Sequence, residues 1–178
     1  MGRQVALLRG INLGPRNRIA MPELRDALGE AGYGEVRTYV QSGNVVLDSG
    51  ERPSALEAAL ERLIAERFDL EIPVIVRTQE ELAEVVRGNP LAGVATDPKR
   101  YQVSFLSEPL DSERVEQLNA VAAESERLVA RGRELYAWHP AGVARSKLWA
   151  RLAGTGLGVK ATARNWTTVE KLLEMASQ

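Results

Sequence analysis

Two segments near the N-terminus carry polar side chains where predicted strands end. The sequence Arg9-Gly10-Ile11-Asn12 follows the apolar run from Val5 to Leu8, and Gln41-Ser42-Gly43-Asn44 separates two β-branched runs. A guanidinium, side-chain amides and backbone N–H groups near glycine are donors suited to an anion. We therefore predict ligand contacts from Arg9, Asn12, Gln41, Ser42 and Asn44. The alternative is that these residues only form tight turns.

Two later segments precede predicted helices. Arg145-Ser146-Lys147 combines two cations and a hydroxyl at a helix start, where unpaired backbone N–H groups suit a phosphate or carboxylate. Arg164-Asn165 precedes the last helix in the same way and adds a charge and an amide. We predict that these five residues belong to the ligand site, with the alternative that Ser146 is a plain helix cap.

Other chemistry finds little support in the sequence. The chain has no cysteine and a single histidine, His139, without the neighbours of a metal site or catalytic triad. The glycine-rich run 154–158 follows a predicted helix and lacks the terminal lysine of a phosphate-binding loop, so we interpret it as a helix end and turn. No spacing selects a pair of carboxylates. We predict no metal and no cofactor, and assign no catalytic residue.

Charge and composition limit the class of partner. A formal net charge of −1 and a pI near 6.0 provide no long-range field to attract polyanions, which disfavours generic nucleic-acid binding. No apolar run approaches the roughly 20 residues that span a bilayer. The lack of cysteine suits a reducing compartment, so we expect a cytoplasmic protein without a membrane segment. Composition does not indicate an oligomeric state.

The first half shows alternating strand and helix patterns. Apolar residues recur at helical spacing from Leu24 to Ala31 and again from Leu56 to Ile64, whereas the segments 36–41, 44–48 and 72–76 are rich in β-branched residues. Thr78 and Glu81 form a capping box for a further short helix. The order is βαββαβ, which is the ferredoxin-like unit.

The second half repeats this order. Strands are predicted at 101–106, 127–131, 134–139 and 158–163, helices from Ser112 and over 146–152, and a final helix from a capping box of Thr167 and Glu170. We predict an α+β protein of duplicated ferredoxin-like units with mainly antiparallel sheets and a C-terminal helix. The halves are 1–88 and 99–178, joined by a connector at 89–98. One continuous mixed sheet is the alternative.

Several motifs resemble one bacterial family. They are the segments Ala6 to Asn12, Gln41 to Val46, Arg145 to Leu148 and Thr162 to Thr167, and together they resemble the family called domain of unknown function 1697. The resemblance implies a ferredoxin-like duplication with an unassigned biochemical role. This chain has Pro15 where the family often has a second glycine.

Three hypotheses for function follow. The leading one is a binding module for a small anionic ligand, such as a nucleotide or phosphorylated metabolite. The second is an enzyme of unknown reaction that uses Lys147 or Ser146, which requires a pocket. The third is a protein or nucleic-acid interaction module in which Tyr136 and Trp138, on one face of a predicted hairpin, form a stacking surface.

Overall fold

The computed structural model describes residues 2–178 and contains two compact units. The first unit comprises the described residues up to Ala83 together with Lys171–Gln178, and the second comprises Glu84–Glu170. Each unit holds one four-stranded antiparallel sheet, so the alternative of one continuous sheet is excluded. This division follows packing, whereas the proposed halves 1–88 and 99–178 follow the repeated order of elements and remain a prediction.

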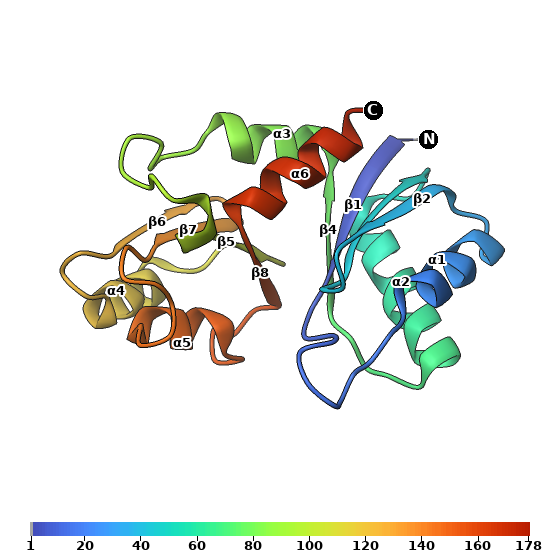
Figure 1. Ribbon diagram of the computed structural model, residues 1–178, viewed down its shortest axis with the longest axis horizontal. Coiled ribbons are helices and arrows are strands. Elements are labelled where there is room, and N and C mark those ends of the chain that lie inside the picture. Colours follow the sequence, from blue (N-terminus) through green and yellow to red (C-terminus); the bar gives the residue numbers. More distant parts are fainter. Residues whose placement is uncertain (1) are drawn as a thin grey trace. The chain divides into compact units, whose positions relative to one another are not determined.

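The first unit is built from β1 (Gly2–Leu8), α1 (Met21–Glu30), β2 (Gly34–Tyr39), β3 (Asn44–Ser49), α2 (Pro53–Phe68) and β4 (Val74–Thr78). The strand order is β2-β3-β1-β4. Both helices cover one face of the sheet (Figure 1), where their buried residues, among them Leu24, Leu28, Leu56 and Leu60, pack on Ala6, Leu8, Val45, Leu47, Val74 and Val76. The core therefore lies between the helices and one side of the sheet.

The second unit repeats that arrangement with β5 (Tyr101–Leu106), α4 (Ser112–Val121), β6 (Arg127–Arg131), β7 (Glu134–Trp138), α5 (Lys147–Ala153) and β8 (Ala161–Asn165). The strand order β6-β7-β5-β8 is equivalent to that of the first unit. Helices α4 and α5 pack against each other on one face of the sheet (Figure 1). Their core contains Leu118, Leu148 and Leu152 against Leu106, Leu135, Ala137 and Ala161.

The equivalence extends to single hydrogen bonds. The Leu8 N–H donates to the Gly43 carbonyl at 2.8 Å, and the Leu106 N–H donates to the Arg133 carbonyl at 2.9 Å, so both central strands leave their sheets beside a hairpin turn. In the last strands, Arg77 pairs with Val5 and Arg164 pairs with Val103. The predicted fold class, two ferredoxin-like α+β units, is thus confirmed in its arrangement.

Three further elements complete the chain: α3 (Gln79–Arg87), the short helix η1 (Pro98–Arg100) and α6 (Trp166–Ala176). The predicted capping box opens α3, because the Glu81 N–H donates to Thr78 Oγ1 and the Thr78 N–H donates to the Glu81 carboxylate. The predicted cap of α6 is wrong. The helix begins at Trp166, and the Asn165 amide oxygen accepts from the Thr168 N–H at 2.9 Å in place of Thr167.

Candidate anion-binding site

The predicted residues of the first unit lie at one end of its strands, where β1 ends beside the turn between β2 and β3. Asn12 joins the two loops: its Nδ2 donates to the Ile19 carbonyl at 2.9 Å and to the Gln41 carbonyl at 2.7 Å, and its Oδ1 accepts from the Ile19 N–H. Its φ of 56° is a left-handed conformation that asparagine tolerates. The Asn12 amide therefore holds the loops together.

The turn itself is closed by Asn44. This residue is fully buried, and its Nδ2 donates to the Tyr39 carbonyl and to Ser42 Oγ, both at 3.0 Å. Gly43 has a φ of +86°, and a Cβ there would lie 2.7 Å from the Leu8 Cβ, so the close approach requires glycine. The amides of Asn12 and Asn44 serve the turns, and of the five predicted residues only Gln41 is exposed, whereas Arg9 is partly buried.

The predicted residues of the second unit lie at the opposite end of their strands, where β7 and β8 end. Register places Trp138 opposite Tyr101 and Asn165 opposite Gln102. In the first unit, the equivalent position is where β3 and β4 end, whereas Arg9 and the residues from Gln41 to Asn44 lie where β1 ends and β3 begins. The motifs of the two units thus lie at opposite ends of equivalent strands.

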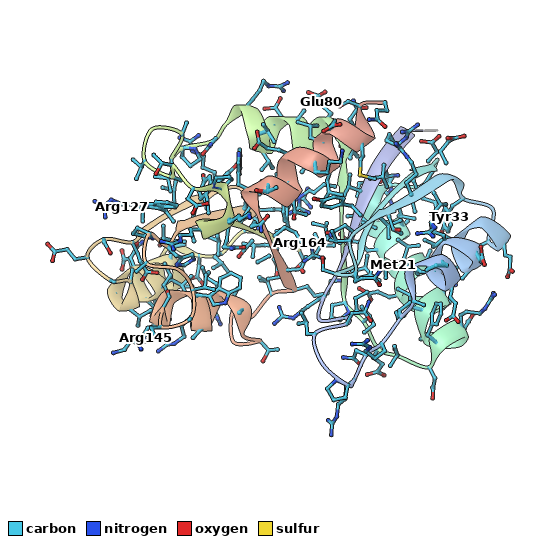
Figure 2. The ribbon with its side chains drawn as sticks, in the orientation of Figure 1. Met21, Tyr33, Glu80, Arg127, Arg145 and Arg164 are labelled. Carbon is cyan, nitrogen blue, oxygen red and sulfur yellow. The ribbon has the colours of Figure 1, made fainter. Side chains whose placement is uncertain are left out.

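Arg164 is an internal residue. Only 9% of it is exposed, and one terminal nitrogen donates to Thr162 Oγ1 at 2.7 Å and to the Ala163 carbonyl at 2.8 Å. Burial lowers the pKa of its guanidinium to about 10, because an ion loses hydration there. Figure 2 shows Arg164 within the ribbon at β8 and Arg145 beside α5 at the periphery of the second unit. Arg164 and the cap Asn165 therefore stabilise the end of β8.

Arg145, Ser146 and Lys147 surround the start of α5. Ser146 is the N-cap, and its Oγ accepts from the Trp149 N–H at 3.0 Å, as the structural alternative predicts. Arg145 and Lys147 are exposed, and neither side chain makes a hydrogen bond or ion pair within residues 2–178. These two cations remain available to a ligand.

A cavity of about 400 Å³ adjoins Arg145. Ser125, Glu126, Gly142 and Ser146 form its walls together with Arg145 and three alanines. Ligand pockets for small molecules span roughly 300–1,000 Å³, so this volume suits a metabolite. The small side chains leave room for the uncharged part of a ligand, while Arg145 supplies a positive charge.

A buried network forms one wall of this cavity, and the sequence did not reveal it. Glu126 Oε2 accepts from Ser146 Oγ at 2.6 Å and lies 2.5 Å from His139 Nδ1, while Oε1 accepts from the Ala123 N–H at 2.9 Å. His139 is fully buried. Burial raises the pKa of the Glu126 carboxyl, but the hydrogen bonds from Ser146 and His139 outweigh that effect and lower it overall.

The network lacks the geometry of a catalytic triad. In a triad the histidine lies between the serine and the carboxylate and takes the hydroxyl proton. Here Ser146 and His139 both contact the same oxygen of Glu126, and Ser146 Oγ lies 3.4 Å from His139 Nδ1. A carboxylate with a lowered pKa is a weak base. The network therefore orders the loop before α5.

The distribution of acidic residues around α5 is a further signal in the sequence. Residues 135–169 contain no aspartate or glutamate, although the whole chain has 24, and they include five basic residues: Arg145, Lys147, Arg151, Lys160 and Arg164. A chain with a net charge of −1 thus concentrates positive charge in one segment of the second unit. This local excess is what an anion site requires.

The aromatic residues proposed for stacking are internal. Tyr136 and Trp138 are 2% and 8% exposed. The Tyr136 hydroxyl donates to the Val85 carbonyl at 3.1 Å, and its ring stacks on Tyr101, whose ring also contacts Trp166. Burial raises the pKa of Tyr136 to about 12. These rings form a core and offer no stacking surface to a base.

Comparison with known proteins defines the class of this chain. A family model described as a protein of unknown function (DUF1697) matches residues 1–136, so the chain belongs to that family. The match ends before the motifs at Arg145–Leu148 and Thr162–Thr167.

One solved structure has the same fold, namely the conserved bacterial protein SP0830 from Streptococcus pneumoniae. It is 24% identical, with a TM-score of 0.79 and 98% of each chain covered. A search of curated proteins finds no match. No helix within residues 2–178 has the length and apolar character to cross a membrane, and no group of histidine, aspartate and glutamate in that range could hold a metal ion.

Proposed function

We propose that the second unit binds a small anionic ligand, such as a nucleotide or phosphorylated metabolite, in the cavity before α5. The observation that carries this proposal is the position of Arg145, a cation without a protein partner in the described chain, on the wall of a 400 Å³ cavity. A charge-assisted contact to a phosphate oxygen is roughly twice as strong as a neutral hydrogen bond.

The charges around the cavity predict the orientation of the ligand. Glu126 is ionised at neutral pH and would repel an anion placed against it. The anionic group therefore belongs beside Arg145, with Lys147 two residues further along the chain, and the uncharged part belongs beside Glu126. A sugar hydroxyl can donate to a carboxylate oxygen there. This polarity favours a sugar phosphate or nucleoside monophosphate over a simple inorganic anion.

Thermal-shift and calorimetric titrations with matched ligand pairs test the proposal. Nucleoside monophosphates and hexose phosphates are compared with their unphosphorylated counterparts at constant ionic strength. We expect a phosphorylated member to stabilise the protein more than its counterpart, and Arg145→Ala to remove that difference. Arg52→Ala, which changes the exposed arginine before the equivalent helix α2, is the matched control and should leave it intact.

Two results would contradict the proposal. One is that no phosphorylated compound in the panel stabilises the protein. The other is that stabilisation by such a compound is the same in the wild type and Arg145→Ala. The enzyme hypothesis gains no specific support from the geometry, since Ser146 Oγ already serves as a helix cap and as a donor to Glu126.

A further inference from the structure

A second, smaller cavity lies at the other end of α5. Its volume is about 200 Å³, and its lining includes Arg114 and Gln117 of α4, Arg151 of α5, and the loop residues Gly154, Gly156 and Leu157. No aspartate or glutamate lines it. Two like charges beside one cavity repel each other unless an anion lies between them. This cavity has its own cations and does not depend on the site before α5.

Arg114 is held in place by the glycine-rich loop. One terminal nitrogen donates to the Leu157 carbonyl at 2.8 Å and to the Gly156 carbonyl at 3.3 Å. A Cβ at Gly158, where φ is +81°, would lie 2.8 Å from the Arg114 Cζ. The loop thus closes tightly around this guanidinium. These contacts fix the orientation of Arg114 before any ligand binds, which lowers the entropy cost of binding.

Arg151 supplies the second charge. Its side chain is exposed and makes no hydrogen bond or ion pair with any other described residue. It belongs to the acid-free segment 135–169, so its own neighbours in sequence do not neutralise it. Arg114 forms a long ion pair with Asp111, whose Oδ2 lies 4.0 Å from Nε and whose side chain is exposed, so that solvent screens the pair. Asp111 thus leaves much of the positive charge uncompensated.

We propose that this cavity binds a phosphate-sized oxyanion, either inorganic phosphate or a terminal phosphoryl group. Its volume lies below the roughly 300 Å³ at which pockets begin to hold a whole small molecule. Guanidinium groups bind phosphate oxygens in pairs, and two arginines on one cavity can share a tetrahedral anion. Gln117 adds a side-chain amide as a further donor.

Titration with inorganic phosphate, followed in ¹H–¹⁵N correlation spectra at constant ionic strength, tests this inference. We expect amide shifts at residues 114–118 and 151–158, and at least about tenfold weaker binding in Arg151→Ala, as the loss of one charged hydrogen bond predicts. Arg151→Lys should recover part of the affinity. Arg52→Ala changes an exposed arginine of the first unit and should leave phosphate binding unchanged. Shifts at residues 151–158 report this cavity, whereas shifts at residues 141–147 report the cavity before α5, which separates this inference from the proposed function.

The two arginines of this cavity differ in how much of the fold depends on them. Arg114→Ala removes the hydrogen bonds that hold the loop, whereas Arg151 is exposed and makes no hydrogen bond or ion pair with any other described residue, so we expect Arg151→Ala to fold. Equal phosphate affinity in the wild type and Arg151→Ala would overturn the inference. Phosphate shifts spread evenly over the surface, or absent from residues 151–158, would do the same.

Discussion

Replacing Glu126 with glutamine tests the network that orders the wall of the larger cavity. The substitution keeps the shape of the side chain but removes its charge, and one end of the new amide must face a donor. Glu126 now accepts three hydrogen bonds, from Ser146, His139 and the Ala123 N–H. A hydrogen bond to a charged group contributes about 1.5–3 kcal/mol. Losing one such bond and weakening another predicts a cost of about 2–4 kcal/mol.

Urea unfolding monitored by tryptophan fluorescence measures this cost. Trp149 reports on the network, because its ring centroid lies 5.8 Å from that of His139. A native domain is stable by only about 5–15 kcal/mol, so the midpoint should fall markedly. Ser146→Ala removes one of these bonds and the helix cap, and should cost about 2–4 kcal/mol. Because both residues share one hydrogen bond, the double variant should cost less than the sum of the two. A loss below about 0.5 kcal/mol for Glu126→Gln would show that the hydrogen bonds to Glu126 do not stabilise the native state as their geometry implies.

Four further predictions concern pH, backbone conformation and burial. The pKa of Glu126 is lowered from its ordinary value of 4.5, so its contribution to stability is present above that pH and is lost as the pH falls through the lowered value. The difference in unfolding free energy between wild type and Glu126→Gln, measured in urea, should therefore shrink in acid. Glycine to alanine changes should lower the unfolding midpoint by different amounts. The decrease should be smallest at Gly132, where the positive φ is the only obstacle, larger at Gly158, and largest at Gly43, where a new Cβ would collide with the Leu8 Cβ. The opposite order would contradict the geometry. Val40 is β-branched and exposed with a φ of 51°, so Val40→Asn should raise the unfolding free energy by about 0.5–1 kcal/mol, and a loss would be evidence against strain at this turn. Arg164→Met should lower stability by about 1–3 kcal/mol through the lost bonds to Thr162 and Ala163, yet leave phosphate binding unchanged, since Arg164 is internal.

Local patterns in the sequence predicted most elements of the fold. The strands at 101–106 and 127–131 match the structure to the residue, because alternating apolar and polar side chains define a strand locally. The last strand was placed at 158–163 but runs from Ala161 to Asn165. Gly158 has a positive φ and closes against Arg114, a contact from a helix some 40 residues earlier that no local pattern reveals.

The candidate site was less accessible to such reasoning. Arg145, Ser146 and Lys147 could be selected because a helix start can be predicted from its own residues. Glu126 and His139 could not, since their contact joins positions 13 apart on either side of a hairpin, and neither residue has a distinctive neighbour. Asn12 and Asn44 were assigned to a ligand, but their amides bind the backbone of the turns. The sequence identifies the polar groups, whereas only the fold shows which of them already form hydrogen bonds within the protein.

A ¹H–¹⁵N titration with adenosine 5′-monophosphate and glucose 6-phosphate shows directly whether the cavity before α5 accepts a phosphorylated small molecule. We predict that at least one of them shifts amides at residues 123–126 and 141–147, with the effect lost in Arg145→Ala. Shifts confined to the first unit, at residues 9–12 and 41–44, would contradict this prediction, and so would the absence of any shift with either compound.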